Sequence, residues 1–134
     1  MTFYKSKEAL KQYRNLGLTS EIGQASPHRL IQLLFEGAVT QLLCANGAME
    51  RRAFEEKARF IDKAVAIISG LRSSLDLSQG ELPENLDRLY EYMSFRLLEA
   101  SQDNDATKVG EVIDLLKTLK SGWDEIPNLV PSPE

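Results

Sequence analysis

The stretch from Gln24 to Val39 constrains the fold more than any other part of the sequence, because it combines a helix start with an excess of apolar residues. Ser26 can accept a hydrogen bond from a free backbone N–H of the first helical turn. Pro27 suits the first helical position, where its missing N–H is not needed. The apolar pattern continues to about Met49, which predicts a helix of about 24 residues, or about 36 Å.

The same helical period recurs three more times, and no strand-like alternation interrupts it. After a break near residues 51–55, a second helix is expected to carry apolar residues from Phe60 to Leu75. The third is expected over 83–100, opened by Pro83, and the fourth over 106–123. Four helices with short connections predict an all-α fold, an antiparallel up-down four-helix bundle.

The two ends of the chain differ from this pattern. Residues 1–25 predict a short helix to about Tyr13 and then an extended stretch, with too few apolar residues for a fifth member of the core. We therefore expect an N-terminal arm over 1–25, a bundle domain over 26–125 and a disordered tail over 126–134, where three prolines stop helix formation.

Composition narrows the class of function. A net charge of −4 and a pI near 5.1 disfavour nucleic acid or an anionic membrane as the main partner, since both require clustered Lys and Arg. The N-terminal residues lack the apolar run of a secretory signal, and no window approaches the roughly 18 apolar residues of a membrane span. One cysteine excludes an internal disulfide. We expect a cytoplasmic, soluble protein.

Residues with catalytic or metal-binding chemistry are scarce, so we expect no enzyme, no cofactor and no metal. His28 is the only histidine and is expected to face solvent in the first turn of the first helix. A bundle can hold a di-metal carboxylate site, but such sites use paired Glu-x-x-His motifs, which this chain lacks. Cys44 is expected as a small core residue, and Gly37 and Gly47 as points of close helix approach.

Two predicted helices carry more apolar surface than their core stripes use. On the first, most apolar residues share a face of about 140°, and Leu33, Val39 and Leu43 fall outside it. On the third, Tyr92, Phe95 and Leu98 lie off the stripe that buries Tyr90 and Met93. These off-stripe residues either pack under the N-terminal arm or line a groove for a partner. An arm could also cover a groove until a partner displaces it.

Several motifs resemble those of FliS-type flagellar chaperones. "QASPHRLIQLLFEGAV" is similar to the opening of that family's first helix, and "GELPENLDRLYEYMSFRLLEA" to its third. "EVIDLLKTLKSGWDE" resembles its last helix, and the likeness spans about Tyr13 to Glu125. Ala53 departs from the family, in which many members place Asp or Asn between the first two helices, so the cap of the second helix is in doubt.

The resemblance implies a cytoplasmic export chaperone without catalytic activity. Family members bind the disordered C-terminal segment of flagellin in extended form along hydrophobic grooves. This binding keeps the subunits apart and favours delivery to the flagellar type III export apparatus. Tyr13 matches the family's N-terminal tyrosine, which precedes the stretch that can cover or adjoin the groove.

We therefore expect a partner-binding groove formed by residues that are surplus to the helix stripes or flank them. The candidates are Tyr13, Leu33, Val39, Ile67, Leu71, Tyr92, Phe95 and Leu98. The main alternative is a helical-bundle adaptor or homodimeric regulator that acts on another flagellar protein, such as an anti-sigma factor. A metal-carboxylate bundle enzyme is a remote second alternative, because the chain has a single histidine.

Overall fold

The computed structural model describes residues 3–16 and 26–126, and these residues are helical for most of their length. The elements in chain order are α1 (Ser6–Asn15), α2 (Pro27–Glu50), α3 (Phe54–Ser73), the short 3-10 helix η1 (Leu77–Gln79), α4 (Glu81–Asp103) and α5 (Ala106–Glu125). The predicted extended stretch after Tyr13 falls mainly on residues 17–25, and most of the predicted tail falls on 127–134; both lie outside the described residues.

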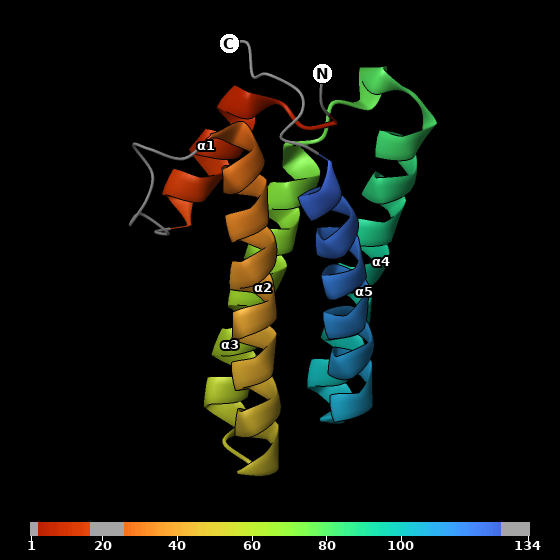
Figure 1. The fold of residues 1–134 in the computed structure, drawn as a ribbon. Helices are drawn as coiled ribbons and strands as arrows, with labels where there is room; N and C mark the ends of the chain where they lie inside the picture. The colour runs from red at the N-terminus through yellow and green to blue at the C-terminus, as the bar shows by residue number, and fades with distance from the viewer. Residues whose placement is uncertain (1–2, 17–25, 127–134) are drawn as a thin grey trace.

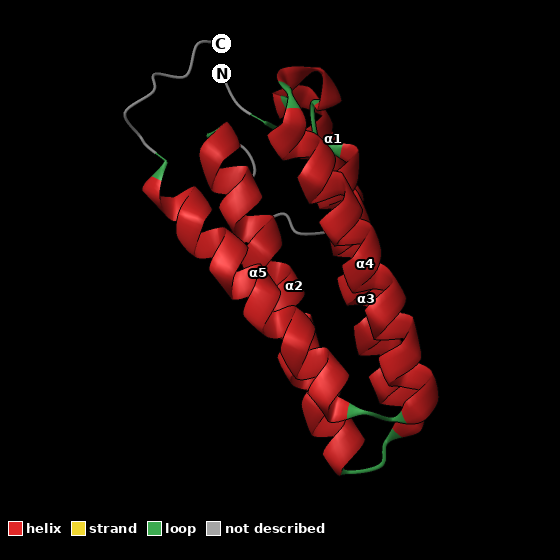
Figure 2. Ribbon diagram, turned by 90° about the vertical axis from the view of Figure 1, so that its right-hand side faces the viewer, coloured by secondary structure: helices red, strands yellow, loops and turns green. Residues whose placement is uncertain are grey.

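The four long helices form an antiparallel up-down bundle, with α1 at the end where α2 begins (Figures 1 and 2). Each long helix packs against the next in the chain, and α5 returns to pack against α2, which closes the ring. The predicted all-α fold with a short N-terminal helix is confirmed.

The core follows the predicted helical stripes. Leu34, Ala38 and Leu42 of α2 are fully buried, as are Tyr90 and Met93 of α4. The remaining buried side chains on the predicted core faces of α2, α4 and α5 are Leu30, Ile31, Phe35, Ala45, Met49, Leu97, Val109, Val112, Ile113, Leu116 and Trp123. Periodicity alone therefore identifies the inward faces of three of the four long helices.

Local signals set the helix ends. The Ser26 hydroxyl accepts a hydrogen bond from the Arg29 backbone N–H at 3.1 Å, with Pro27 in the first helical position. α3 begins after Ala53, and no side chain caps it. α4 begins at Glu81, two residues before the expected start at Pro83. It follows Gly80, whose φ of +114° is readily accessible only to glycine.

The N-terminal segment contributes more to the core than its composition suggests. Tyr4, Ala9 and Tyr13 are all buried, so residues 3–16 add three side chains to the core, although the ten-residue α1 is much shorter than the four bundle helices. The segment around Tyr4 forms an isolated antiparallel bridge to Leu75. Backbone hydrogen bonds from Lys5 to Ser74 and from Asp76 to Phe3 flank that bridge, at 2.6 and 2.7 Å.

Aromatic side chains join the N-terminal segment to the bundle. The Tyr4 and Tyr90 hydroxyls are hydrogen-bonded at 2.6 Å, and the Tyr4 ring meets Trp123 edge-on with ring centroids 5.2 Å apart. His28 stacks on the other side of this cluster, with its ring 4.8 Å from that of Trp123. His28 Nε2 contacts the Trp123 carbonyl, and Trp123 Nε1 donates to the His28 carbonyl. The expectation that His28 faces solvent is therefore wrong.

Two further expectations about α2 are wrong. Cys44 is exposed instead of lying in the core. A Cβ at Gly47 would meet only the side chain of Arg51, so no other helix approaches closely there. The close approach occurs at Gly70 of α3, where a Cβ would lie 3.3 Å from the Cβ of Gln12 in α1.

Candidate partner-binding groove

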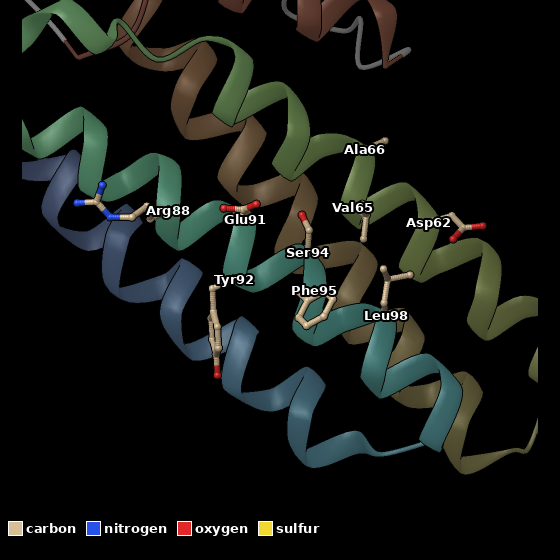
Figure 3. Close-up of a pocket in the computed structure, with 9 residues that line it drawn as sticks. All are labelled: Asp62, Val65, Ala66, Arg88, Glu91, Tyr92, Ser94, Phe95 and Leu98. Carbon is tan, nitrogen blue, oxygen red and sulfur yellow. The ribbon is translucent and has the colours of Figure 1, made fainter.

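An open groove of about 770 Å³ runs between α3 and α4 (Figure 3). Its wall on α3 is formed near Val65, and its wall on α4 near Phe95 and Leu98, whose side chains lie between the two helices in the close-up. The full lining comprises Asp62, Val65, Ala66, Arg88, Glu91, Tyr92, Ser94, Phe95 and Leu98.

Polar ties hold α3 and α4 together at the two ends of this groove. At one end, Arg72 donates two hydrogen bonds to the Asp87 carboxylate, at 2.6 and 3.2 Å. At the other, the Lys57 ammonium donates to the carbonyl of Ser101 at 2.8 Å and to the side chain of Asn104 at 3.2 Å. From Asp87 to Ser101 the two ties lie about 21 Å apart along α4, and the lining of the groove covers Arg88 to Leu98, or about 15 Å.

The charges at the Arg72 end explain the close contact between the Arg72 guanidinium and the Asp87 carboxylate. The Arg72 guanidinium holds the pKa of Asp87 below its usual range, mainly through their hydrogen bond. Glu91 lies 3.7 Å from Arg72 and adds a second acidic partner. The same contacts raise the pKa of Arg72, with the hydrogen bond to Asp87 as the largest cause. This end of the groove is therefore an ion-paired bridge between the helices.

Between the two ties, large apolar side chains on α4 are open to solvent. Phe95 is 64% exposed, Leu98 54% and Tyr92 43%. Beyond the Arg72–Glu91 ion pair, no hydrogen bond or ion pair joins α3 to α4 between residues 92 and 100 of the described chain. Contiguous exposed apolar surface on a small protein marks a surface that binds something.

Tyr92 is held at the side of the groove that faces α5. Its hydroxyl donates to the Glu111 carboxylate, and Arg96 donates to the same carboxylate at 2.7 Å. The hydrogen bond raises the pKa of Tyr92, since ionisation would place a second negative charge beside Glu111. It also lowers the pKa of Glu111, and Arg96 acts in the same direction. The Tyr92 ring therefore has a fixed orientation between the α3–α4 groove and α5.

Polar contacts instead close the surface between α2 and α5. Gln32 donates to Asp124 at 2.7 Å, and Lys120 lies 3.8 Å from Glu36. The Lys120 ammonium also donates to Asp124, which lowers the pKa of that carboxyl. These charged and amide groups join α2 to α5 near the start of α2.

The predicted groove residues fall into three places. Tyr92, Phe95 and Leu98 line the open α3–α4 groove together. Ile67 and Leu71 are fully buried on α3, and Tyr13 is buried on α1, which packs against α2 and α3. Leu33 and Val39 are half-buried on α2.

One alternative is that the off-stripe residues of α4 pack under the N-terminal arm. Residues 3–16 do not cover them. α1 packs against α2 and α3, and Phe95 and Leu98 stay exposed. Sequence reasoning missed the remaining lining residues, Asp62, Val65, Ala66, Arg88, Glu91 and Ser94. Val65 is one of the apolar residues expected on the second helix. The others carry no large apolar side chain, and only the antiparallel register of α3 and α4 indicates them.

The described residues contain no group of three or more His, Cys, Asp or Glu side chains placed to hold a metal ion. None of the described helices is long and apolar enough to cross a membrane.

The structure is a small helical bundle with an open apolar groove, and comparison with known proteins identifies its family. A family model described as "Flagellar protein FliS" matches residues 9–130. The chain is 51% identical over 120 residues to the flagellar secretion chaperone FliSB of Pseudomonas aeruginosa, covering 89% of this chain and 95% of that relative.

More distant relatives carry the same description. The chain is 39% identical over 119 residues to the flagellar secretion chaperone FliS of Salmonella typhimurium, covering 87% and 88% of the two chains. It is 34% identical over 120 residues to FliS of Vibrio cholerae, covering 89% and 88%. The chain belongs to the FliS family, and it is a flagellar export chaperone.

Proposed function

We propose that this protein binds the C-terminal segment of flagellin in the cytoplasm, prevents its premature polymerisation and assists its delivery to the flagellar type III export apparatus. Membership of the FliS family supports this proposal. The single structural observation that carries it is the open α3–α4 groove, with Phe95 and Leu98 more than half exposed.

The physical requirement for such a partner matches this surface. A segment that is disordered when free loses conformational entropy on binding, so it needs a long apolar surface in return. The lined part of the groove spans about 15 Å, enough for about four or five extended residues at about 3.3 Å each. A longer segment would need further surface, and the half-buried Leu33 and Val39 on α2 are our candidates for it.

The first test is direct binding of the flagellin C terminus. We expect the last ~40 residues of the same organism's flagellin to form a 1:1 complex with this protein at micromolar concentration, measured by calorimetry. Absence of that complex would contradict the proposal.

A variant of Phe95 connects the binding to the groove. Phe95→Asp is expected to weaken the complex about tenfold or more, because a charge replaces the most exposed apolar side chain of the groove. Helix content by circular dichroism should stay unchanged. Leu82→Asp is a matched control, since Leu82 lies on the same helix, is 47% exposed and is outside the groove. If Phe95→Asp unfolds the protein, Phe95 belongs to the core and the groove assignment is wrong.

The same exposed patch could serve a second candidate function, in which two copies pair through Phe95 and Leu98 to form a homodimeric regulator of another flagellar protein, such as an anti-sigma factor. Size-exclusion mass at low micromolar concentration separates the two. A monomer that binds the flagellin peptide supports the chaperone. A dimer that Phe95→Asp converts to a monomer supports the regulator.

A further inference from the structure

Of the three large apolar side chains exposed in the open groove, only Tyr92 ends in a polar group. Its ring lines the groove together with Phe95 and Leu98, and it is 43% exposed. A ring exposed to this degree on a helix surface can occupy more than one rotamer unless a contact holds it. A partner that binds a mobile ring has to immobilise it, and the lost freedom weakens binding. The affinity of the groove therefore depends on what holds Tyr92.

The Tyr92 ring is held by a carboxylate on α5. Its hydroxyl donates to one oxygen of Glu111, Oε2, and Arg96 Nε donates to the other, Oε1, at 2.7 Å. Tyr92 and Arg96 lie four residues apart on α4, so both side chains reach the same face of that helix. In Figure 3 the Tyr92 hydroxyl points toward α5 and away from α3. With a donor on each oxygen, the carboxylate has a fixed position, and it fixes the far end of the ring.

Neighbouring charges keep Glu111 in the form that accepts these hydrogen bonds. Arg96 also donates to Glu99 at 3.2 Å, so the guanidinium beside Glu111 is itself oriented. Lys108, one turn earlier on α5, is engaged in a separate ion pair. The hydrogen bonds from Tyr92 and then from Arg96 lower the pKa of Glu111. The carboxylate is therefore ionised at neutral pH, and hydrogen bonds to an ionised acceptor are the stronger kind.

Glu111 itself lies outside the groove. The lining includes Tyr92 of α4 but no residue of α5, so Glu111 acts on a partner between α3 and α4 through the Tyr92 ring. The side chains of Glu111 and Arg96 are 36% and 32% exposed, and an ion pair at such exposure contributes little to folding. A role in binding can therefore be separated by experiment from a role in stability.

We propose that Glu111 is a positioning residue of the α3–α4 groove, through which α5 holds the Tyr92 ring in the orientation that the partner binds. This proposal rests on the proposed function, because the partner is taken to be the C-terminal segment of flagellin. It assigns a part in binding to a helix that contributes nothing to the lining of the groove. Because the Tyr92 donor is already used, the group of the partner that lies beside this ring is expected to be apolar.

A double-mutant cycle on the full-length chain tests the positioning role. The probe is a peptide of the last ~40 residues of the same organism's flagellin, and calorimetry measures its affinity. We expect Glu111→Ala and Tyr92→Phe each to weaken binding about threefold, because each variant frees the ring. The double variant should also bind about threefold more weakly, since the ring cannot be freed twice. A loss of about ninefold in the double variant, or an unchanged affinity in either single variant, would overturn the positioning role.

A spectroscopic titration checks the hydrogen bond itself. Subtracting the ultraviolet titration of Tyr92→Phe from that of the wild type isolates the Tyr92 phenol. The hydrogen bond to Glu111 raises the pKa of this phenol above the ordinary value of about 10. The same difference measured in a Glu111→Ala background should return toward about 10. Identical difference curves in the two backgrounds would overturn the contact on which the proposal depends.

Asp114→Ala is the matched control, because Asp114 is another exposed carboxylate of α5, one turn further along and outside the groove. It should leave the affinity unchanged, and an equal loss would show that the net charge of α5 is the cause. If Glu111→Ala unfolds the chain by circular dichroism, Tyr92→Phe alone still tests the proposal, since an unchanged affinity overturns it. A wild-type protein that binds no peptide refutes the proposed function, whereas equal binding by wild type and Glu111→Ala refutes only the positioning role.

Discussion

The two sides of α3 lie in contrasting surroundings. Toward α2, the side chains of Ile67 and Leu71 are fully buried, and α1 packs over that junction. Toward α4, Phe95 and Leu98 remain more than half exposed, and no element covers them in the described chain. One helix thus borders both a covered groove and an open groove. Apolar content alone therefore does not distinguish a core from a binding surface. What distinguishes them is whether another element of the protein covers the apolar side chains.

α1, which packs over the junction of α2 and α3, is held by specific contacts. Tyr4 precedes α1 and joins it to the bundle through Tyr90 and Trp123, and Gly70 allows α1 to approach α3. Among residues 3–16 and 26–126, the polar ties across the open groove lie toward its two ends, at Arg72 and at Lys57. Its centre is therefore free for a partner that brings its own apolar side chains.

Truncating one residue from each groove should give the largest difference between them. Leu71→Ala should lower the free energy of unfolding by about 2–5 kcal/mol, because it leaves a cavity in the core. Leu98→Ala should change it by no more than about 0.5 kcal/mol, since Leu98 is 54% exposed. Urea unfolding of both variants measures this. Similar losses in the two variants would mean that the open groove belongs to the core.

The Tyr4 contact predicts a loss of stability at alkaline pH. Burial raises the pKa of Tyr4 to about 12 and also raises that of Tyr90. In the unfolded chain tyrosine ionises near pH 10. The stabilisation is therefore complete below pH 10 and is lost as pH rises toward 12.

Removing one hydroxyl tests that account. Tyr4→Phe should cost about 1–3 kcal/mol at pH 7, because the buried Tyr90 hydroxyl loses its partner. Its stability should then fall less steeply than that of the wild type between pH 10 and 11. Urea unfolding across this range checks the slope. Parallel curves would show that Tyr4 does not hold its neutral form in the folded state.

Much of this comparison could be predicted from sequence. Helical periodicity gives the inward faces of α2, α4 and α5, and it separates Phe95 and Leu98 from the stripe that contains Met93, because intrahelical spacing is a local property. Which neighbour covers an off-stripe residue is a long-range property. Periodicity could not show that Ile67 and Leu71 are covered while Phe95 is open.

Cys44 illustrates the same limit. Leu33 and Cys44 are eleven residues apart and so lie on nearly the same side of α2, separated by about 16 Å along its axis. Leu33 is half-buried while Cys44 is exposed, and α1, which is only about 15 Å long, packs near the start of α2 and does not extend along its whole length (Figure 1). The sequence of α2 alone carries no information about how far α1 extends along it.

Adding a side chain at Gly70 tests how α1 is held. A Cβ there would lie 3.3 Å from that of Gln12, so Gly70→Val should push α1 away from α3 at a cost of about 1 kcal/mol. Hydrogen exchange of the α1 amides should become faster while the bundle stays protected. Gly122→Val is the matched control, because a Cβ at Gly122 meets nothing within 4 Å. Unchanged exchange in α1 would mean that Gln12 moves aside and the approach is not tight.

The smallest effect is expected at the end of the open groove, where Arg72 pairs with Asp87. The hydrogen bond from Arg72 lowers the pKa of Asp87, so its stabilisation is present above the unfolded value of about 3.9 and is lost as pH falls through the lower folded value. Because both side chains are partly exposed, Asp87→Asn should cost less than about 1 kcal/mol at pH 6.

The difference between wild type and Asp87→Asn should therefore shrink as pH falls below about 4, and also in high salt. Urea unfolding at pH 6 and pH 3 measures it, with Asp114→Asn as an exposed control on α5. A difference that stays constant down to pH 3 would show that Asp87 acts through shape and not charge. An ion pair this weak can exchange partners at little cost, so a cationic group on a bound segment could compete for Asp87 or Glu91. α1 is held differently, because the buried hydrogen bond between Tyr4 and Tyr90 fixes the segment that precedes it. No weak surface ion pair is involved in that contact.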